Sequence, residues 1–536
     1  MPTLDERAER TVSDRSWQAF VHKAAWWHRV EIAKDGSGFP FWPGLFFQMK
    51  QSIRVIWHGV CGGSPHPPRN PKHALSRAVG TQTHRARPGD SVVVLAAVLV
   101  SAAAAGAAPA AVRVEPADRP VLEAFLEHVD DSAARCTPAR MEAFARQPED
   151  IVWQASRYVR LPLLAYRLTG KPAYLDAFVE RCDALFACLE KGPDGFLGWY
   201  GLPLDLFRHP DHPDRRVDVV LTSFEATGLV ADFARTVQAN AALRRRYARP
   251  VKRYLDVTEN HLVRKWEARG GYKDLGRRGA VYVTHPALKP VKASLTEPHN
   301  KHAKIARALL ALYKATGRDA HLAKAVRLAA RFKRCLSLEG GAYRWNYWDP
   351  AGPWDVHPEK PGAWKHWIGP EHRGGYYGLS LSQAVVFYEH GLVFERADID
   401  RFVRTQTAVC WNGDVERPQW ARVDGRTAEQ RYLCPLLALF DERIYQVAFT
   451  GPAQQERVKR RGHSWQGAVV AAGYLETKYL ALPRWRGGKP AETDAVAAFM
   501  KRAANRRLLE ALAFEVEAPG YRAPRTPAEA GWKTPQ

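Results

Sequence analysis

The sequence predicts an all-α fold made of helix hairpins. Apolar residues recur at spacings of three, four or seven along most of the chain after residue 115, as in Val152, Val159 and Leu163, and this spacing places them on one helix face. Alternation typical of strands is scarce, and residues 281–283 are the best short candidate. One pattern also occurs twice: YRLTGKPAYL at 166–175 is echoed by YKATGRDAHL at 313–322.

The repeated pattern is typical of two helices joined by a short turn. Gly170 and Gly317 stand where a helix C-cap favours glycine, and a second helix is expected within a few residues. A solenoid would repeat every 34–47 residues or so, and no such period occurs. Uneven loops instead favour a closed ring of hairpins, an (α/α) toroid. We expect this domain to span 112–515, followed by a flexible tail at 516–536.

The N-terminal region differs from the rest. Residues 1–90 have weak periodicity and a turn-rich run, GGSPHPP, at 62–68, which predicts a poorly structured extension. Residues 91–111, SVVVLAAVLVSAAAAGAAPAA, follow basic residues and end in small ones, as a secretory signal peptide does. We therefore expect a periplasmic or secreted protein whose true start lies downstream of residue 1. The alternatives are a buried helix or a membrane anchor, but the apolar run is shorter than the roughly 20 residues that a membrane span needs.

The charge balance favours an anionic partner. Lys and Arg total 79 against 56 Asp and Glu, a net charge of +23. An acidic polysaccharide, a nucleic acid or an anionic membrane surface would suit this charge. The basic residues form no dense stripe, and their longest runs, 244–246 and 459–461, are typical of solvated helix faces, so no nucleic acid is expected. The seven cysteines show no CxxC spacing, which excludes a zinc ribbon. The sequence favours no oligomeric state.

An aromatic loop at 343–377 predicts a carbohydrate-binding cleft. Its tryptophans and tyrosines are interleaved with histidine, lysine and arginine. Sugar rings stack their C–H faces on aromatic rings, while their hydroxyl groups need polar partners. The alternative is a loop that caps the helical core. The expected substrate-binding residues are Trp345, Trp348, Trp354, Trp364, Trp367 and Tyr377, with Trp199 in a second loop at 195–212.

Two segments offer catalytic groups. His299 and Asn300 lie just before a predicted amphipathic helix, where Asn300 could instead be the N-cap. His372, Arg373 and Tyr376 follow the aromatic loop, with His372 and Tyr376 four residues apart. His299 and His302 are spaced as a metal pair could be, but no third ligand follows at a recognisable spacing. We therefore predict no metal and no cofactor.

The later hairpins resemble those of (α/α)-toroid carbohydrate-active enzymes. The resemblance is one of layout, over about 118–480, and its segments are 299–317, YRWNYW at 343–348, 376–391 and 398–411. That group includes alginate-lyase-like polysaccharide lyases, glucuronyl epimerases and six-hairpin glycosidases. It implies a lyase that neutralises a uronate carboxylate with Asn, His or Arg and uses His and Tyr as base and acid.

Other activities remain compatible with these residues. A C5-epimerase needs nearly the same groups as a lyase, because it also begins by removing the proton next to the carboxylate. A glycoside hydrolase needs two carboxylates. The candidates for such a pair are Glu225, Asp349, Asp355 and Glu371. A glycan-binding toroid without catalysis is the non-enzymatic alternative. The positive charge favours the lyase, because an acidic polymer is attracted to the protein.

Overall fold

The computed structural model describes residues 111–461, 465–485, 502, 506–507 and 521–532. The chain divides into two compact units, Met1–Ala105 and Gly106–Gln536, and all described residues belong to the second. The predicted extension at 1–90 and the signal-like segment up to residue 110 lie outside the described residues.

Helices dominate the described residues, which confirms the predicted all-α class. The α-helices are α3 (Arg119–Asp131), α4 (Pro138–Ala145), α5 (Pro148–Asp150), α6 (Ser156–Thr169), α7 (Ala173–Phe186), α8 (Val220–Gln238), α9 (Ala241–Val257), α10 (Arg264–Ala268), α11 (His299–Thr316), α12 (Asp319–Arg334), α13 (Gly374–Glu389), α14 (Arg396–Arg404), α15 (Glu442–Tyr445), α16 (Pro452–Arg461) and α17 (Trp465–Leu475). Short π-helical segments cover Ile151–Ala155, Thr258–Val263, Thr405–Val409, Gln446–Thr450 and Glu476–Ala481. Turns of 3-10 helix cover Pro116–Asp118, Ser132–Arg135, Asp205–Phe207, Gly276–Arg278, Pro353–Asp355, Pro435–Leu439 and Leu482–Trp485.

The strands in the described residues form small antiparallel pairs within the loops between helices. They are β1 (Glu190–Lys191) with β2 (Leu197–Gly198), β3 (Tyr272–Asp274) with β4 (Ala280–Tyr282), β5 (Ser337–Glu339) with β6 (Ala342–Arg344), and β7 (Trp420–Ala421) with β8 (Thr427–Ala428). In the longest pairs Tyr272 faces Tyr282 and Ser337 faces Arg344. The strand expected at 281–283 is present as β4, shifted by one residue.

Both predicted hairpins are confirmed. Gly170 ends α6 with φ 70° and Gly317 ends α11 with φ 71°, in the left-handed region that glycine adopts without strain. The next helices, α7 and α12, begin a few residues later. Each hairpin folds back on itself, because α6 packs on α7 and α11 on α12.

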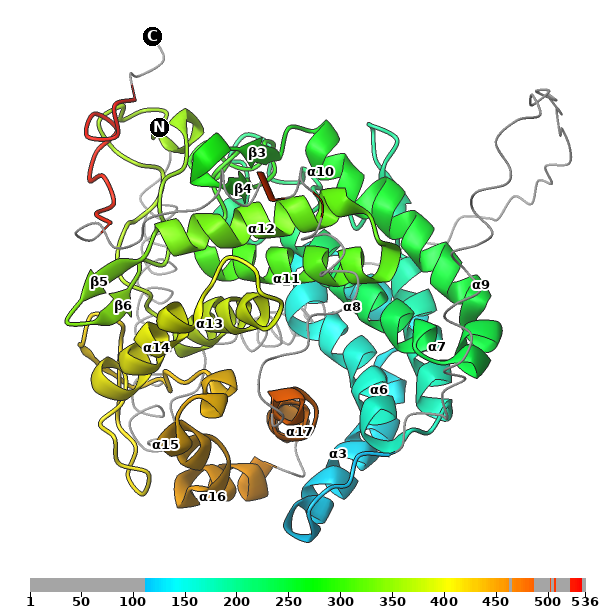
Figure 1. Ribbon diagram of the computed structural model, residues 1–536. Coiled ribbons are helices and arrows are strands. Elements are labelled where there is room, and N and C mark those ends of the chain that lie inside the picture. The colour runs from blue at the N-terminus through cyan, green and yellow to red at the C-terminus, as the bar shows by residue number, and fades with distance from the viewer. Residues whose placement is uncertain (1–110, 462–464, 486–501, 503–505, 508–520, 533–536) are drawn as a thin grey trace, which may run out of the picture. The chain divides into compact units, whose positions relative to one another are not determined.

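The hairpins pack on one another in chain order. α6 contacts α8, α8 contacts α11, and α11 contacts α13, while α7, α9, α12 and α14 each pack on the helix that precedes them in their own hairpin. Figure 1 shows this order by colour, from α6 and α7 in cyan through α11 and α12 in green to α13 and α14 in yellow. α13 also contacts the segment Pro435–Leu439. Pro435–Leu439 contacts Glu476–Ala481, and Glu476–Ala481 in turn contacts α6. α17 packs on α3, so the last helices return to the first.

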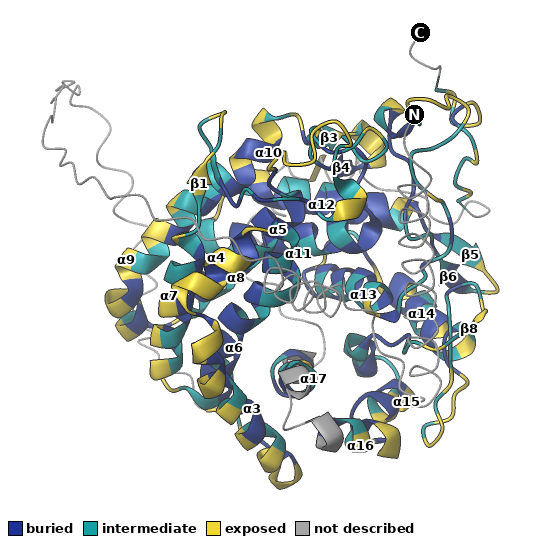
Figure 2. Ribbon diagram, turned by 180° about the vertical axis from the view of Figure 1, so that it is seen from behind, coloured by how far each residue is buried: buried dark blue, intermediate teal, exposed yellow. Residues whose placement is uncertain are grey.

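The apolar core lies along the first helices of the hairpins. α8 and α11 are buried over most of their length, whereas α9 carries an exposed stripe (Figure 2). Leu309 and Leu312 of α11 and Phe224 of α8 are fully buried. Burial of each such side chain contributes about 1.5–3 kcal/mol relative to its exposure.

No helix within the described residues is both long and apolar enough to cross a membrane. Of the seven cysteines, the six that fall in the described part of the chain are free thiols.

Candidate functional site

The loop between β6 and α13 is held in place by its own backbone and by α11. The Tyr347 amide donates to the Gly369 carbonyl at 2.8 Å, and the Glu371 amide donates to the Trp345 carbonyl at 3.2 Å. The two arms of the loop therefore run antiparallel. The amide of His299, the first residue of α11, donates to the Tyr347 carbonyl at 3.2 Å. This bond fixes the loop against the start of α11.

Asp355 anchors the middle of the same loop. Its carboxylate accepts hydrogen bonds from the Thr296 amide at 2.8 Å, the Thr296 hydroxyl at 2.7 Å and the Ala351 amide at 2.7 Å. Burial raises the pKa of Asp355, and these donors oppose that rise. We assign Asp355 the task of shaping the loop.

The loop, α13 and the first turn of α11 together present an aromatic–basic cluster, which we define as Lys301, Tyr347, Trp367, His372, Arg373 and Tyr376. The rings of Tyr347 and Tyr376 are stacked, with centroids 5.6 Å apart. His372 meets Tyr347 edge-on at 4.7 Å and Tyr376 at 6.1 Å. Trp367 meets His372 edge-on at 5.6 Å and is 49% exposed. The cluster thus offers an imidazole, two phenols and an exposed indole side by side.

Two cations belong to this cluster. The Arg373 guanidinium lies 5.6 Å from the Tyr376 ring centroid and forms no ion pair with another described residue. Lys301 Nζ lies 3.1 Å from Glu297 Oε2 and 3.9 Å from Glu149 Oε1. Burial opposes the charge of Lys301, but the two carboxylates raise its pKa above the ordinary value. Of these two cations, Arg373 is therefore the one that is free to bind an anionic ligand.

The cluster contains one group that can accept a proton and two that can donate one. Burial, with help from Arg373 and Arg422, lowers the pKa of His372, so its imidazole is neutral at pH 7. The His372 side chain is 34% exposed, and its buried Nδ1 has no hydrogen-bond partner among the described residues. Burial raises the pKa of Tyr347 and of Tyr376, so both phenols keep their protons. A neutral imidazole can accept a proton, and a phenol can donate one.

Glu371 supports the backbone under this cluster. Its Oε1 accepts the amide hydrogens of His372 at 2.8 Å and Arg373 at 3.3 Å. Burial raises the pKa of Glu371 to about 8, so the group is protonated at pH 7. Its Oε2 is buried without a hydrogen-bond partner among the described residues.

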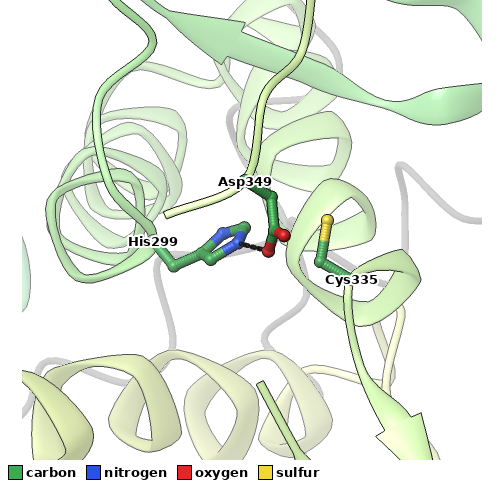
Figure 3. A group of neighbouring side chains, drawn as sticks. All are labelled: His299, Cys335 and Asp349. Carbon is green, nitrogen blue, oxygen red and sulfur yellow. Dashed lines mark hydrogen bonds and ion pairs between the residues drawn. The ribbon is translucent and has the colours of Figure 1, made fainter. Parts of the chain in front are cut away.

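His299 and Asn300 lie at the start of α11 but outside the aromatic–basic cluster. Nε2 of the buried His299 donates to Asp349 Oδ2 at 2.8 Å (Figure 3). Asn300 is not the N-cap considered above, because α11 begins at His299 and its N-cap is Pro298. Asn300 is instead 1% exposed inside the first turn, and its Oδ1 has no partner within the described part of the chain.

The ring of His302 contacts the backbone of β4. Burial lowers the pKa of His302 to about 3, so its ring is neutral. Its Nε2 accepts the Tyr282 amide at 2.9 Å, which joins α11 to β4.

The structure divides the predicted substrate-binding residues by burial. Four of them are buried and pack in the interior: Trp199, Trp345, Trp348 and Tyr377. Trp354 and Trp364 are half-buried and donate their indole N–H to Thr296 Oγ1 and to the Pro524 carbonyl, both at 2.9 Å. Trp367 presents a large exposed surface. A ring must reach solvent to stack on a polymer, so Trp367 fits that role best.

The structure adds residues that sequence reasoning did not choose. Tyr347 was inside the predicted aromatic loop, but nothing in the spacing separated it from its neighbours. Lys301 lies between Asn300 and His302 in the sequence, and its spacing did not single it out. Their roles appear only when α11 and the loop are placed together.

Two cavities lie near these elements. One, of about 750 Å³, is lined by residues of the aromatic loop and by the C-terminal segment, including Trp345, Asn346, His366 and Tyr521. The other, of about 600 Å³, lies among α6, α8, α11 and α13. Glu225, one of the candidate carboxylates for hydrolysis, lines this second cavity and pairs with Lys304 at 2.5 Å.

No family model fits the chain, and no curated protein is similar to it at a significant level.

Proposed function

We propose that this chain is an exported enzyme that cleaves an acidic polysaccharide by β-elimination at a uronate. The observation that supports the proposal most directly is the position of His372. It is a neutral, partly exposed imidazole that contacts two protonated phenols, and it neighbours a guanidinium that has no ion-pair partner among the described residues. β-Elimination next to a carboxylate needs a base, an acid and a group that neutralises the carboxylate, and the cluster offers all three types of group.

Each group then has a defined task. Arg373, with Lys301 nearby, pairs with the uronate carboxylate and stabilises the charge that develops there. His372 accepts the proton from C5, and the electrons of that bond form the C4–C5 double bond. The C4–O bond breaks, and the leaving oxygen takes a proton from Tyr376, with Tyr347 stacked behind it. Positioned acid and base groups each contribute about 10²–10⁴-fold to a rate.

His299 and Asn300 act indirectly in this proposal. Both are buried, so we assign them to positioning the start of α11, on which Lys301 lies. Trp367 is the ring that stacks on the sugar chain, because it is half exposed beside His372.

We further propose that the helices form an (α/α) toroid. The support is the circuit of contacts from α6 through α8, α11 and α13 to Pro435–Leu439 and back through Glu476–Ala481 to α6. In such a ring the long loops are expected to gather at one end. Export is proposed from the signal-like run at 91–111. Protein from the native host should begin near residue 112, and an intact residue 1–90 segment on cytoplasmic protein would contradict export.

The first test is ultraviolet absorbance during incubation with alginate, pectin-type and heparan-type polymers. Elimination creates a double bond conjugated to the carboxylate, which absorbs, and hydrolysis does not. We expect Tyr376→Phe and His372→Gln to lower the rate by at least 10²-fold, because each removes one proton-transfer group. Tyr445→Phe, on α15, is the matched control and should keep full activity.

Other outcomes identify the alternatives. Deuterium uptake at C5 from heavy water without cleavage would indicate a C5-epimerase that uses the same base. New reducing ends without absorbance would indicate hydrolysis. Hydrolysis has less support than elimination, because the candidate carboxylates are not free to act as a pair. Asp349, Asp355 and Glu371 are buried, and Glu225 is paired with Lys304. Binding without any reaction would indicate a glycan-binding protein.

A further inference from the structure

Three buried side chains with different donor atoms meet behind the aromatic loop. His299 starts α11, Cys335 directly follows α12, and Asp349 lies in the loop (Figure 3). One imidazole nitrogen, the thiol sulfur and one carboxylate oxygen lie within 4.8 Å of one another. All three residues are at most 4% exposed. Their convergence joins three segments that are distant in the sequence.

This set of donors is unusual for a site that serves packing alone. A thiol, an imidazole and a carboxylate are the ligands that zinc accepts in proteins, with bonds of about 2.0–2.3 Å. A small adjustment of the side chains would bring the three donors onto one ion. The negative charges of the Cys335 thiolate and the Asp349 carboxylate would together balance the two positive charges of Zn²⁺.

The surroundings support a ligand role for these groups. Asn346 donates its side-chain N–H to the second oxygen of Asp349 at 2.8 Å, and this outer contact orients the carboxylate. Tyr521 from the C-terminal segment lies 3.4 Å from the same oxygen. Cys335 and Tyr521 also line the 750 Å³ cavity, which offers an ion a path to the cluster.

Arg331 lies one turn before Cys335. Its Nη2 donates to the Pro350 carbonyl at 2.7 Å, and this bond ties the end of α12 to the loop that carries Asp349.

We propose that His299, Cys335 and Asp349 bind one zinc ion, with water or the Tyr521 hydroxyl in the fourth position. The ion would tie the start of α11 and the end of α12 to the loop that carries the aromatic–basic cluster. Its part is structural, so the proposal stands independently of the proposed enzymatic function.

Cobalt provides the test, because a thiolate bound to Co²⁺ gives a charge-transfer band in the near ultraviolet. Full-length protein freed of metal by a chelator is titrated with Co²⁺ and then with Zn²⁺. We expect one equivalent of Co²⁺ per chain, the band, and its loss when Zn²⁺ displaces the cobalt. Cys335→Ser should lose the band, whereas Cys434→Ser, which removes another buried free thiol, should keep it.

A second variant keeps the result decisive if Cys335→Ser does not fold. Asp349→Asn leaves the thiolate in place but should weaken Co²⁺ binding at least tenfold, with an unchanged circular dichroism spectrum. Absence of stoichiometric Co²⁺ binding to the wild-type protein would overturn the proposal. A band that persists in Cys335→Ser, or an unchanged affinity in Asp349→Asn, would overturn it as well.

Discussion

Glu371 links stability to pH at the level of a single residue. Its carboxyl group is fully buried, and burial raises its pKa from 4.5 to about 8. Between these values the folded chain keeps a proton that the unfolded chain has released. The contribution of Glu371 to the free energy of unfolding is therefore fully present below pH 4.5. It falls by about 1.4 kcal/mol per pH unit as the pH rises from there toward 8.

Glu371→Gln should remove that dependence. The amide oxygen can still accept the His372 and Arg373 amide hydrogens, but the side chain no longer ionises. Urea denaturation between pH 5 and 8 should show a flatter stability profile than in the wild type, with the variant more stable at pH 8. Glu339→Gln, at an exposed glutamate of β5, is the control and should keep the wild-type slope. Parallel profiles for Glu371→Gln and the wild type would refute this assignment.

At the level of one element, the start of α13 has two glycines in different surroundings. A Cβ on Gly374 would collide with the Arg431 carbonyl oxygen, whereas a Cβ on Gly375 would have no neighbour within 4 Å. Gly374 also donates its amide hydrogen to Gln430 Oε1 at 3.2 Å. This close approach of α13 to 430–431 sets the position of Tyr376, in the first turn of the helix.

Gly374→Ala should therefore destabilise the protein, by about 1–3 kcal/mol for overpacking against backbone. Gly375→Ala should be neutral or stabilise it by up to about 1 kcal/mol, since alanine is the better helix former. Chemical denaturation measures both changes, and the adjacent pair serves as its own control. Equal effects of the two substitutions would show that the packing of α13 against 430–431 is not tight.

At the level of the whole described unit, Asp118 joins the first helices to the last. Its buried carboxylate accepts hydrogen bonds from Tyr474, Tyr479 and Lys478, with Lys478 Nζ at 2.8 Å. Lys478 is only 6% exposed, and its second partner, Glu115, lies at 2.7 Å. These bonds hold α17 and the following segment against α3.

Asp118→Asn should weaken the whole unit. It leaves a buried lysine with one carboxylate, which should cost about 3 kcal/mol, at the low end for a broken buried ion pair because Glu115 remains. Asp256→Asn is the control: its pair with Lys252 is exposed, and such pairs contribute at most about 1 kcal/mol. Thermal unfolding followed by circular dichroism compares them. A loss for Asp118→Asn no larger than for Asp256→Asn would mean that the contact between the first and last helices adds little.

Much of the fold could be predicted from the chain alone. The helices and both hairpins around Gly170 and Gly317 were predictable, because periodicity and capping are local properties of a few neighbouring residues. The proximity of His372, Arg373 and Tyr376 was also predictable, since they lie close together in the sequence around the start of α13, and their catalytic role stays a prediction. The spacing did not reveal that Tyr347 and Lys301 join them.

The remaining features depend on contacts between distant segments. Trp348 and Trp367 have similar surroundings in the sequence, yet one is fully buried and the other is half exposed. Their difference arises because hydrogen bonds from α11 and Thr296 fix the path of the loop. His299, Cys335 and Asp349 likewise follow no recognisable ligand spacing and meet only through the packing of α11, α12 and the loop. Local spacing determines which residues share a helix face, and long-range packing determines which side chains meet and which reach solvent.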